Sequence, residues 1–71
     1  MQELSERIEN DFTYHAPKGD QKHRYEDLRA TGKFLAGKMI DHCPNSRELS
    51  LALTKLEEAV MWANASIARN E

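Results

Sequence analysis

Flat rings and guanidinium groups are the side chains of this sequence that best suit specific binding chemistry. Aromatic and imidazole rings can stack on nucleobases, and arginine holds phosphate through two parallel N–H donors. Asn64, Gln21 and Thr13 add amide and hydroxyl groups that can read base edges or ribose hydroxyls. Together these types suit a small nucleotide. The rings belong to Phe12, Tyr14, His15, Tyr25 and Trp62, and the guanidinium groups to Arg24, Arg29 and Arg69.

Most of these residues also have a purely structural explanation, which the sequence leaves open. Phe12 and Tyr14 can plug the end of a small core, and Tyr25 falls on an apolar helical stripe where we expect it to pack first. Arg24 lies off that stripe, where arginines are commonly solvated. Arg69 is in the last turn of a predicted helix, where a cation is favourable even without a ligand.

Asn64 is the most informative of the polar residues, because its neighbours in the sequence are apolar. It stands among Trp62, Ala63 and Ala65. Burial of a carboxamide on an apolar helix face is unfavourable unless the amide is hydrogen-bonded. We therefore expect Asn64 to have a hydrogen-bond partner.

The catalytic and metal-binding patterns of helical enzymes are incomplete in this chain. Glu57-Glu58 would need a further carboxylate one turn later to match the all-α nucleotide pyrophosphatases, but position 61 is Met. Glu26 is followed at the di-iron spacing by Arg29 instead of histidine, and no glycine-rich phosphate loop follows a strand. Cys43 is the sole cysteine, so no internal disulfide forms, and its spacing from the histidines does not suit zinc. We expect a binding protein without cofactor or metal rather than an enzyme.

Length, charge and hydropathy narrow the class of protein further. The 71 residues suffice for one domain, and a chain this short usually needs help to be stable, such as association with other copies. The net charge of −2 argues against a general nucleic-acid binder, although residues 17–40 hold six lysines and arginines against three acids. No apolar stretch approaches the roughly 20 residues of a membrane span, and the acidic start lacks the pattern of a signal peptide. We expect a cytoplasmic protein that binds neither DNA nor membranes.

Apolar periodicity predicts an all-α chain, organised as a single helical hairpin domain. Apolar residues recur at three- and four-residue steps along most of the chain, which is the period of an amphipathic helix. Pro17 and Gly19 interrupt this period near the start, and Pro44 interrupts it again further on. We therefore expect a short helix over residues 3–11, a loop over 12–19, and long helices over 20–43 and 46–69, all in one domain over residues 1–71.

Polar residues at the expected helix starts mark the ends more closely. Asp20 is the expected N-cap of the first long helix. Asn45 or Ser46 is expected to cap the second, and Asn45 and Glu48 have the spacing of a capping box. Because only Pro44 to Ser46 connect the two long helices, we expect the helices to lie side by side and antiparallel.

Each long helix has one apolar stripe, and we expect the two stripes to face each other. Gly32 lies on the first stripe although glycine lowers helix propensity, so it is expected to let the other helix approach closely. The first stripe comprises Tyr25, Leu28, Gly32, Leu35, Ala36, Met39 and Cys43, and the second comprises Leu49, Ala52, Leu53, Leu56, Val60, Ala63 and Ile67.

Further apolar residues lie off these stripes, where a two-helix hairpin has nothing to cover them. An exposed tryptophan beside methionine is more typical of an interface than of a solvated surface. We expect these residues to form an oligomer interface, either in a dimer with a four-helix arrangement or in a larger symmetric assembly. The set comprises Phe34, Leu51, Met61 and Trp62, with Ala65 beside them.

Several stretches of the chain, taken together, carry a resemblance to a known family. They are Phe12 to Pro17, Gln21, Arg24-Tyr25, Arg29, Cys43 to Glu48, Leu53 to Ala65, and Ile67 to Asn70. The run Met61-Trp62-Ala63-Asn64-Ala65 with Ile67-Ala68-Arg69 is the most specific part. In these stretches the chain resembles the small hairpin-domain proteins of bacteriophages and prophages, the anti-CBASS and anti-Thoeris cyclic-nucleotide sponges. The resemblance covers nearly the whole chain.

The resemblance implies helical hairpins that assemble as dimers arranged in threes, giving a hexamer with ligand pockets between protomers. It implies sequestration, without cleavage, of cyclic dinucleotides, cyclic trinucleotides or cyclic ADP-ribose isomers, so that CBASS or Thoeris effectors are not activated. The site of action would then be the cytoplasm of an infected bacterial cell. By the resemblance, Phe12, Tyr14 and His15 contact base or ribose, Arg24, Arg29 and Arg69 contact phosphate, and Lys18, Gln21 and Asn64 are further ligand contacts.

A function of a different class also fits the residues. A helical interaction or regulatory module would use Met61 and Trp62 to grip a protein partner and would bind no small ligand. A nucleotide hydrolase is a third interpretation, and it predicts turnover and a metal requirement. Removal of Trp62 tests the interaction module, and recovery of unchanged ligand from the complex would exclude the hydrolase.

Overall fold

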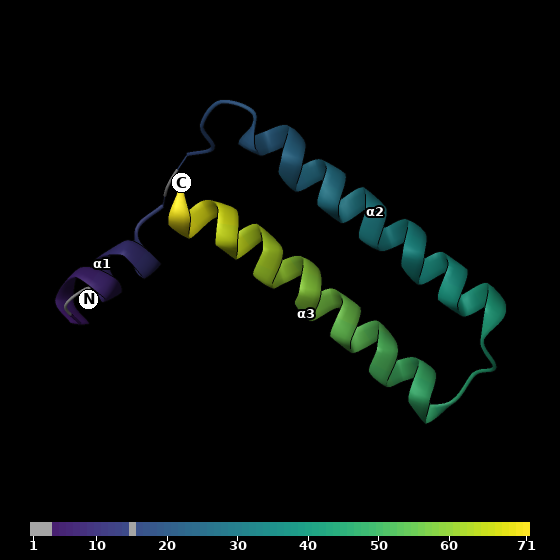
Figure 1. The fold of residues 1–71 in the computed structure, drawn as a ribbon. Coiled ribbons are helices and arrows are strands. Elements are labelled where there is room, and N and C mark those ends of the chain that lie inside the picture. Colours follow the sequence, from purple (N-terminus) through teal and green to yellow (C-terminus); the bar gives the residue numbers. More distant parts are fainter. Residues whose placement is uncertain (1–3, 15) are drawn as a thin grey trace.

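Three helices make up the protein in its computed structural model, which describes residues 4–14 and 16–71, without the side chains of residues 10 and 11. The helices are α1 (Leu4–Phe12), α2 (Gln21–His42) and α3 (Arg47–Asn70), and no strand occurs among the described residues. α2 and α3 lie side by side and antiparallel, and α1 stands apart from them near the end of α3 (Figure 1). The start of α2 and the end of α3 therefore share one end of the molecule, which we call the open end of the hairpin.

The predicted all-α hairpin is confirmed, and each helix boundary that the described residues test differs by one residue from its expected position. α3 begins and ends one residue later than expected, α1 ends one residue later, and α2 begins one residue later and ends one residue earlier. The expected start of α1 at residue 3 lies outside the described residues. None of the described helices is long and apolar enough to cross a membrane.

The two predicted caps are only partly right. Ser46 rather than Asn45 caps α3, because the Ser46 Oγ accepts a hydrogen bond from the backbone N–H of Leu49 at 3.1 Å. The predicted capping box of Asn45 and Glu48 is therefore wrong, since the third residue after the actual cap is a leucine. Asp20 does occupy the N-cap position of α2, but its side chain makes no capping hydrogen bond there.

The predicted stripes form the contact between α2 and α3, which is closest around Gly32 and Val60. A β-carbon added at Gly32 would lie 2.7 Å from Cγ2 of Val60, which is shorter than an ordinary carbon contact. Every predicted stripe residue of α3 is half-buried, as are most of those of α2. Leu35 and Cys43 are exposed, so their assignment to the contact is wrong: a single antiparallel partner covers only a narrow strip of α2, and Cys43 lies beyond its last turn.

The hairpin has no fully buried apolar side chain among its described residues. The single buried side chain in that part of the chain is Gln21, at 6% exposure. Two helices can cover only one strip of each other, so most of both faces meets solvent. The predicted interface set is indeed uncovered in the single chain, with Phe34 at 67%, Leu51 at 46%, Met61 at 53% and Trp62 at 58% exposure.

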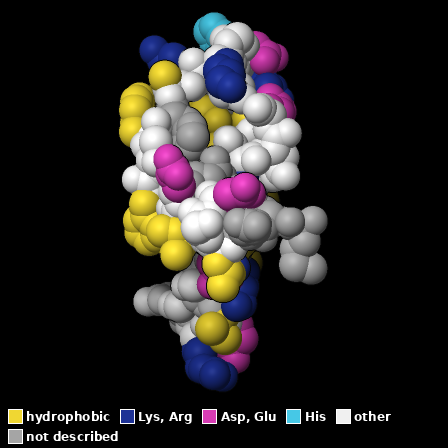
Figure 2. All heavy atoms as spheres, turned by 90° about the vertical axis from the view of Figure 1, so that its left-hand side faces the viewer, with side chains coloured by type: hydrophobic (Ala, Val, Ile, Leu, Met, Phe, Trp, Pro, Cys, Tyr) yellow, Lys and Arg dark blue, Asp and Glu magenta, His cyan; other side chains and the backbone are white. Residues whose placement is uncertain are grey.

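α1 and the loop after it also leave their apolar residues uncovered. Leu4 and Ile8 fall on one face of α1 and are 74% and 59% exposed. Phe12 and Tyr14 are 86% and 85% exposed, so in the single chain they do not plug the end of a core. Figure 2, which looks toward the open end, shows apolar side chains on the surface beside cations and carboxylates.

Candidate functional site

A polar pocket lies at the open end, where the loop before α2 meets the last turn of α3. Its volume is about 190 Å³. Two of its residues carry positive charge and one carries negative charge, so it suits a polar, anionic group more than an apolar one. The pocket, which we call the open-end pocket, is lined by Ala16, Lys18, Gln21, Tyr25, Ala68, Arg69 and Glu71.

Gln21 ties the loop to both helices and so shapes this pocket. Its side-chain oxygen accepts a hydrogen bond from the backbone N–H of Lys18 at 2.9 Å, and its backbone N–H donates to the Lys18 carbonyl at 3.0 Å. Its side-chain nitrogen donates to the Glu71 carboxylate at 3.3 Å. Gly19 makes this turn possible, because its φ of +55° lies in the left-handed region that glycine adopts without strain. The buried amide of Gln21 thereby fixes Lys18 at the mouth of the pocket.

Arg24 joins the start of α2 to Glu71 through both nitrogens of its fork. Nη1 donates to Oε2 of Glu71 at 2.8 Å, and Nη2 donates to Oε1. The same Nη2 lies 3.2 Å from Oδ1 of Asp20, one helical turn earlier. Among the described residues, Arg24 Nε is buried and has no hydrogen-bond partner. One guanidinium is thus shared by two carboxylates.

This arrangement changes the proton affinity of both partners. The hydrogen bonds from Arg24 and then from Gln21 lower the pKa of the Glu71 carboxyl from 4.5 to about 2. The hydrogen bond to Glu71 is also the main reason why the pKa of Arg24 is raised above its ordinary value. Near neutral pH the pair is therefore fully charged, with Glu71 as an anion on the wall of the pocket.

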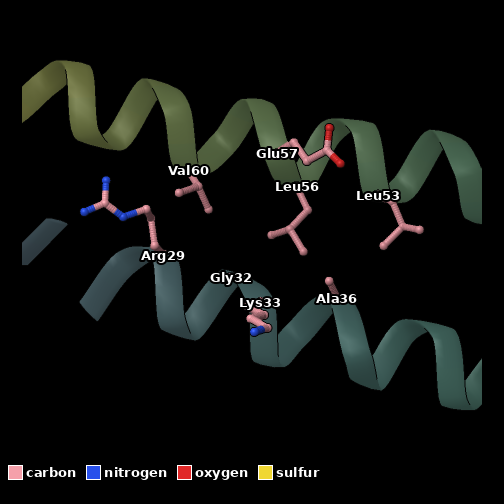
Figure 3. A pocket seen from close by; sticks show the side chains of 8 residues that line it. All are labelled: Arg29, Gly32, Lys33, Ala36, Leu53, Leu56, Glu57 and Val60. Atoms are coloured by element: carbon pink, nitrogen blue, oxygen red, sulfur yellow. The ribbon is translucent and has the colours of Figure 1, made fainter. Parts of the chain in front are cut away.

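Arg29 lies away from the open-end pocket, in an apolar groove halfway along the hairpin. This groove has a volume of about 280 Å³. In Figure 3, Leu53, Leu56 and Val60 point from α3 toward α2, and Arg29 stands at one end of the row. The mid-hairpin groove is lined by Arg29, Gly32, Lys33, Ala36, Leu53, Leu56, Glu57 and Val60.

Asn64 is half-buried on α3, as its apolar neighbours suggested. Its Oδ1 is buried and has no hydrogen-bond partner among the described residues. The expectation that the fold would supply a partner is therefore not met in the part of the chain that the structure describes. A buried amide oxygen without a donor is unfavourable, so this atom suits a donor from outside the hairpin.

The structure gathers some of the predicted ligand residues and leaves others apart. Lys18, Gln21 and Arg69 line the open-end pocket, and Arg24 reaches its wall through Glu71. Arg29 and Asn64 are absent from its lining, and the exposed Phe12 and Tyr14 are not part of it either. His15 lies outside the described residues. The ligand roles of all nine residues stay predictions.

Glu71 was not predicted from the sequence as a member of the pocket. The alignment of α2 against α3 could have identified it. Gly32 and Val60 meet. Eleven residues before Gly32 and eleven residues after Val60 stand Gln21 and Glu71, which are hydrogen-bonded. Eleven residues make about three turns, so the same faces meet again. A glycine that marks the closest approach of two antiparallel helices therefore predicts their other pairs.

The model of the Acb2/Tad1 hairpin domain matches residues 5–68. The chain belongs to this family. The Acb2/Tad1 hairpin domain is that of the anti-CBASS and anti-Thoeris sponges, which are binding proteins rather than enzymes, so the predicted resemblance is confirmed. Neither the curated proteins nor the solved structures compared with the chain gave a match.

The Acb2/Tad1 match and the open-end pocket overlap incompletely. The matched residues include Lys18, Gln21, Arg24 and Tyr25, which supply one side of the pocket. Arg69 and Glu71 on the other side lie just beyond the match. The α2 side of the pocket thus falls within the matched region, and the last residues of the α3 side lie outside it.

Proposed function

We propose that this Acb2/Tad1 protein binds cyclic nucleotide messengers of bacterial immunity and sequesters them without cleavage. The ligands are cyclic dinucleotides, cyclic trinucleotides or cyclic ADP-ribose isomers, and their capture blocks CBASS or Thoeris signalling in an infected bacterial cell. Family membership supports the class of function. The single observation of the structure that supports it is the gathering of Lys18, Gln21 and Arg69 around one pocket beside Arg24.

The size of the open-end pocket supports ligand sites shared between copies of the chain. Small-molecule sites usually measure roughly 300–1,000 Å³, whereas this pocket measures about 190 Å³. One chain therefore offers room for a phosphate and part of a sugar, but not for a whole cyclic dinucleotide. A ligand with two phosphates and two bases suits two copies of the pocket, each supplying the same groups.

The uncovered faces of the hairpin support the same assembly. Phe34, Leu51, Met61 and Trp62 need a partner surface, and a second hairpin supplies one by completing a four-helix arrangement. We propose that dimers of this kind associate further into a hexamer. In that assembly the exposed rings of Phe12 and Tyr14 are available to stack on the bases of a ligand held by a neighbouring copy.

Native mass spectrometry of the purified protein with a panel of messengers tests this proposal. The panel comprises cyclic di- and trinucleotides and cyclic ADP-ribose isomers. We expect a hexamer that retains one of them in a fixed, small-integer ratio, and the ligand should be recovered chemically unchanged after denaturation. An oligomer that retains no member of the panel would contradict the proposal, and a cleaved ligand would contradict sequestration.

A second candidate function is a helical module that captures a protein partner. The observation in its favour is that Met61 and Trp62, adjacent on α3, are 53% and 58% exposed. Under this alternative, Trp62→Ala eliminates partner capture, and the wild-type protein retains none of the messengers. Under the leading proposal, the same substitution weakens self-association instead.

A further inference from the structure

Glu71 occupies the place on Arg24 that a phosphate group would take. Its two carboxylate oxygens accept from Nη1 and Nη2, which is the two-pronged geometry by which arginine also holds phosphate. Glu71 faces the open-end pocket together with Lys18 and Arg69. An arginine next to the pocket is therefore engaged by an anion of the protein itself.

The geometry points to Glu71 as a displaceable internal anion that determines which ligands the open-end pocket accepts. This inference rests on the proposed function, because it concerns how that pocket takes a phosphate. When a ligand phosphate binds, two of its oxygens replace those of Glu71 on the Arg24 fork. Glu71 then turns toward solvent, where its charge is hydrated, and its hydrogen bond from Gln21 is given up.

Exchange is favoured over simple addition of a third anion. Arg24 already meets two carboxylates, those of Glu71 and Asp20. A phosphate added beside them would be repelled by both, and Nη1 and Nη2 of Arg24 already donate to the Glu71 oxygens. Displacement of Glu71 removes one of these two carboxylates from Arg24. The other carboxylate, that of Asp20, does not line the pocket and stays on Arg24.

The exchange selects a class of ligand. A phosphodiester or pyrophosphate group offers two free oxygens to Arg24 while the same ligand reaches Lys18 or Arg69, so it can compensate for the lost Glu71 contact. A neutral nucleoside has no such pair of oxygens and leaves Glu71 in place. A carboxylate-gated pocket therefore discriminates against uncharged nucleosides, even though their bases and sugars resemble those of the messenger.

The test compares Glu71→Gln with Asp20→Asn in the intact assembly. Both substitutions remove one negative charge next to Arg24, but only Glu71 lines the pocket. Pyrophosphate serves as the probe, and the NMR signal of the buried Arg24 Nε–H reports its binding at constant ionic strength. We expect Glu71→Gln to tighten pyrophosphate binding about two- to five-fold, because one partly exposed ion pair no longer competes for Arg24. Asp20→Asn should have a clearly smaller effect.

Other outcomes overturn the inference. If Glu71→Gln binds pyrophosphate no more tightly than the wild type, Glu71 positions Arg24 instead of competing for it. Equal gains in both variants would show a general charge effect. Glu71→Ala, which leaves no oxygen for Arg24, should tighten binding at least as much as Glu71→Gln, and weaker binding would likewise contradict displacement.

The same experiment separates this inference from the proposed function. If the messenger panel fails but Glu71→Gln still tightens pyrophosphate binding, the anion exchange stands and the choice of ligand is wrong. If a messenger binds the wild type but Glu71→Gln does not bind it more tightly, the proposed function stands and the role of Glu71 is wrong. Circular dichroism and native mass of each variant confirm that helix content and assembly are unchanged.

Discussion

At the scale of single residues, one wall of the open-end pocket depends on an arginine outside its lining that meets two carboxylates. Arg24 contacts Glu71 through Nη1 and Nη2, and it contacts Asp20 through Nη2 alone. Gln21 holds the same Glu71 carboxylate and the Lys18 backbone. The side chains that shape the pocket thus form one connected network, and a change in any of them is expected to be felt by the others.

Arg69 is the residue whose loss should most directly remove ligand binding. Arg69→Ala takes one of the two cations from the pocket lining, and charge-assisted hydrogen bonds to phosphate are among the strongest available. We expect the affinity for a messenger to fall about ten-fold or more, with the oligomer intact, as measured by native mass spectrometry and calorimetry.

Lys55→Ala is the matched control for Arg69→Ala. It removes the same charge from α3, but Lys55 is 74% exposed and does not line the pocket. Its messenger affinity should stay close to that of the wild type. Normal binding by Arg69→Ala, or equal losses in both variants, would show that Arg69 is not a phosphate contact.

The pH dependence of the Arg24–Glu71 contact follows from the lowered pKa of Glu71. Because this pKa is about 2 in the fold against an ordinary 4.5, the contact stabilises the folded state above pH 4.5. The contribution is lost as the pH falls through about 2. A carbon-13 NMR titration of the Glu71 carboxyl should therefore have a midpoint near 2, and Arg24→Gln should return it toward 4.5. A wild-type midpoint near the ordinary value would mean that the pair does not form in solution.

At the scale of helices, much of the hairpin could be predicted because its pattern is local. Seven stripe positions on α3 follow the helical period, and all are half-buried as expected. Pro44 and Ser46 end one helix and begin the next within a few residues. Leu35 was assigned to the contact wrongly, because periodicity gives the face of a helix but not the width that its partner covers.

Gly32 is predicted to be required at the helix contact, and Gly37 is not. A β-carbon at Gly32 would meet Val60, whose branched side chain has little freedom to turn in a helix. Gly32→Ala should lower the free energy of unfolding by about 1–3 kcal/mol, measured by urea titration. Gly37 faces open space, so Gly37→Ala should raise it by about 0.5–1 kcal/mol through helix propensity alone.

A double substitution provides the control for this pair, because it removes the methyl group of Val60 that the added β-carbon would meet. In Gly32→Ala/Val60→Ala the added carbon no longer meets Cγ2, because the valine methyl groups are gone. The double variant should then be more stable than the two single effects, added together, would suggest. Equal effects of alanine at Gly32 and Gly37 would show that the helices are not packed as closely as in this structure.

At the scale of the whole molecule, the sequence predicted the hairpin but not the open-end pocket. The loop and both long helices could be foreseen, but the gathering of Lys18, Gln21 and Arg69 depends on which turns of α2 and α3 face each other. The sequence marks Gly32 as a point of close approach, but it does not name the residue of α3 that meets it, which is Val60. Phe12, Tyr14 and Asn64 lie outside the pocket in one chain, so a role for them in binding requires groups from another copy.

Folding and assembly are predicted to be coupled, because no apolar side chain of the described residues is fully buried in one chain. The midpoint of thermal unfolding should therefore rise with protein concentration. Trp62→Ala should weaken the assembly by at least about 2 kcal/mol if Trp62 is central to the interface, as measured by analytical ultracentrifugation. An unfolding midpoint that does not change with concentration, together with a monomeric mass, would contradict the predicted assembly.

The lack of a fully buried apolar side chain among the described residues also bears on how much protein must be made. A protein that captures messengers in a fixed ratio, without destroying them, is useful only when its binding sites are at least as numerous as the molecules to be captured. Mass action makes the same abundance drive the hairpins together, whereas a dilute, unassembled chain exposes its apolar faces and is open to proteolysis. If the protein acts in this way, protection of an infecting phage should depend on the expression level of the protein with a threshold. Below that level we expect no protection, and slightly above it we expect full protection.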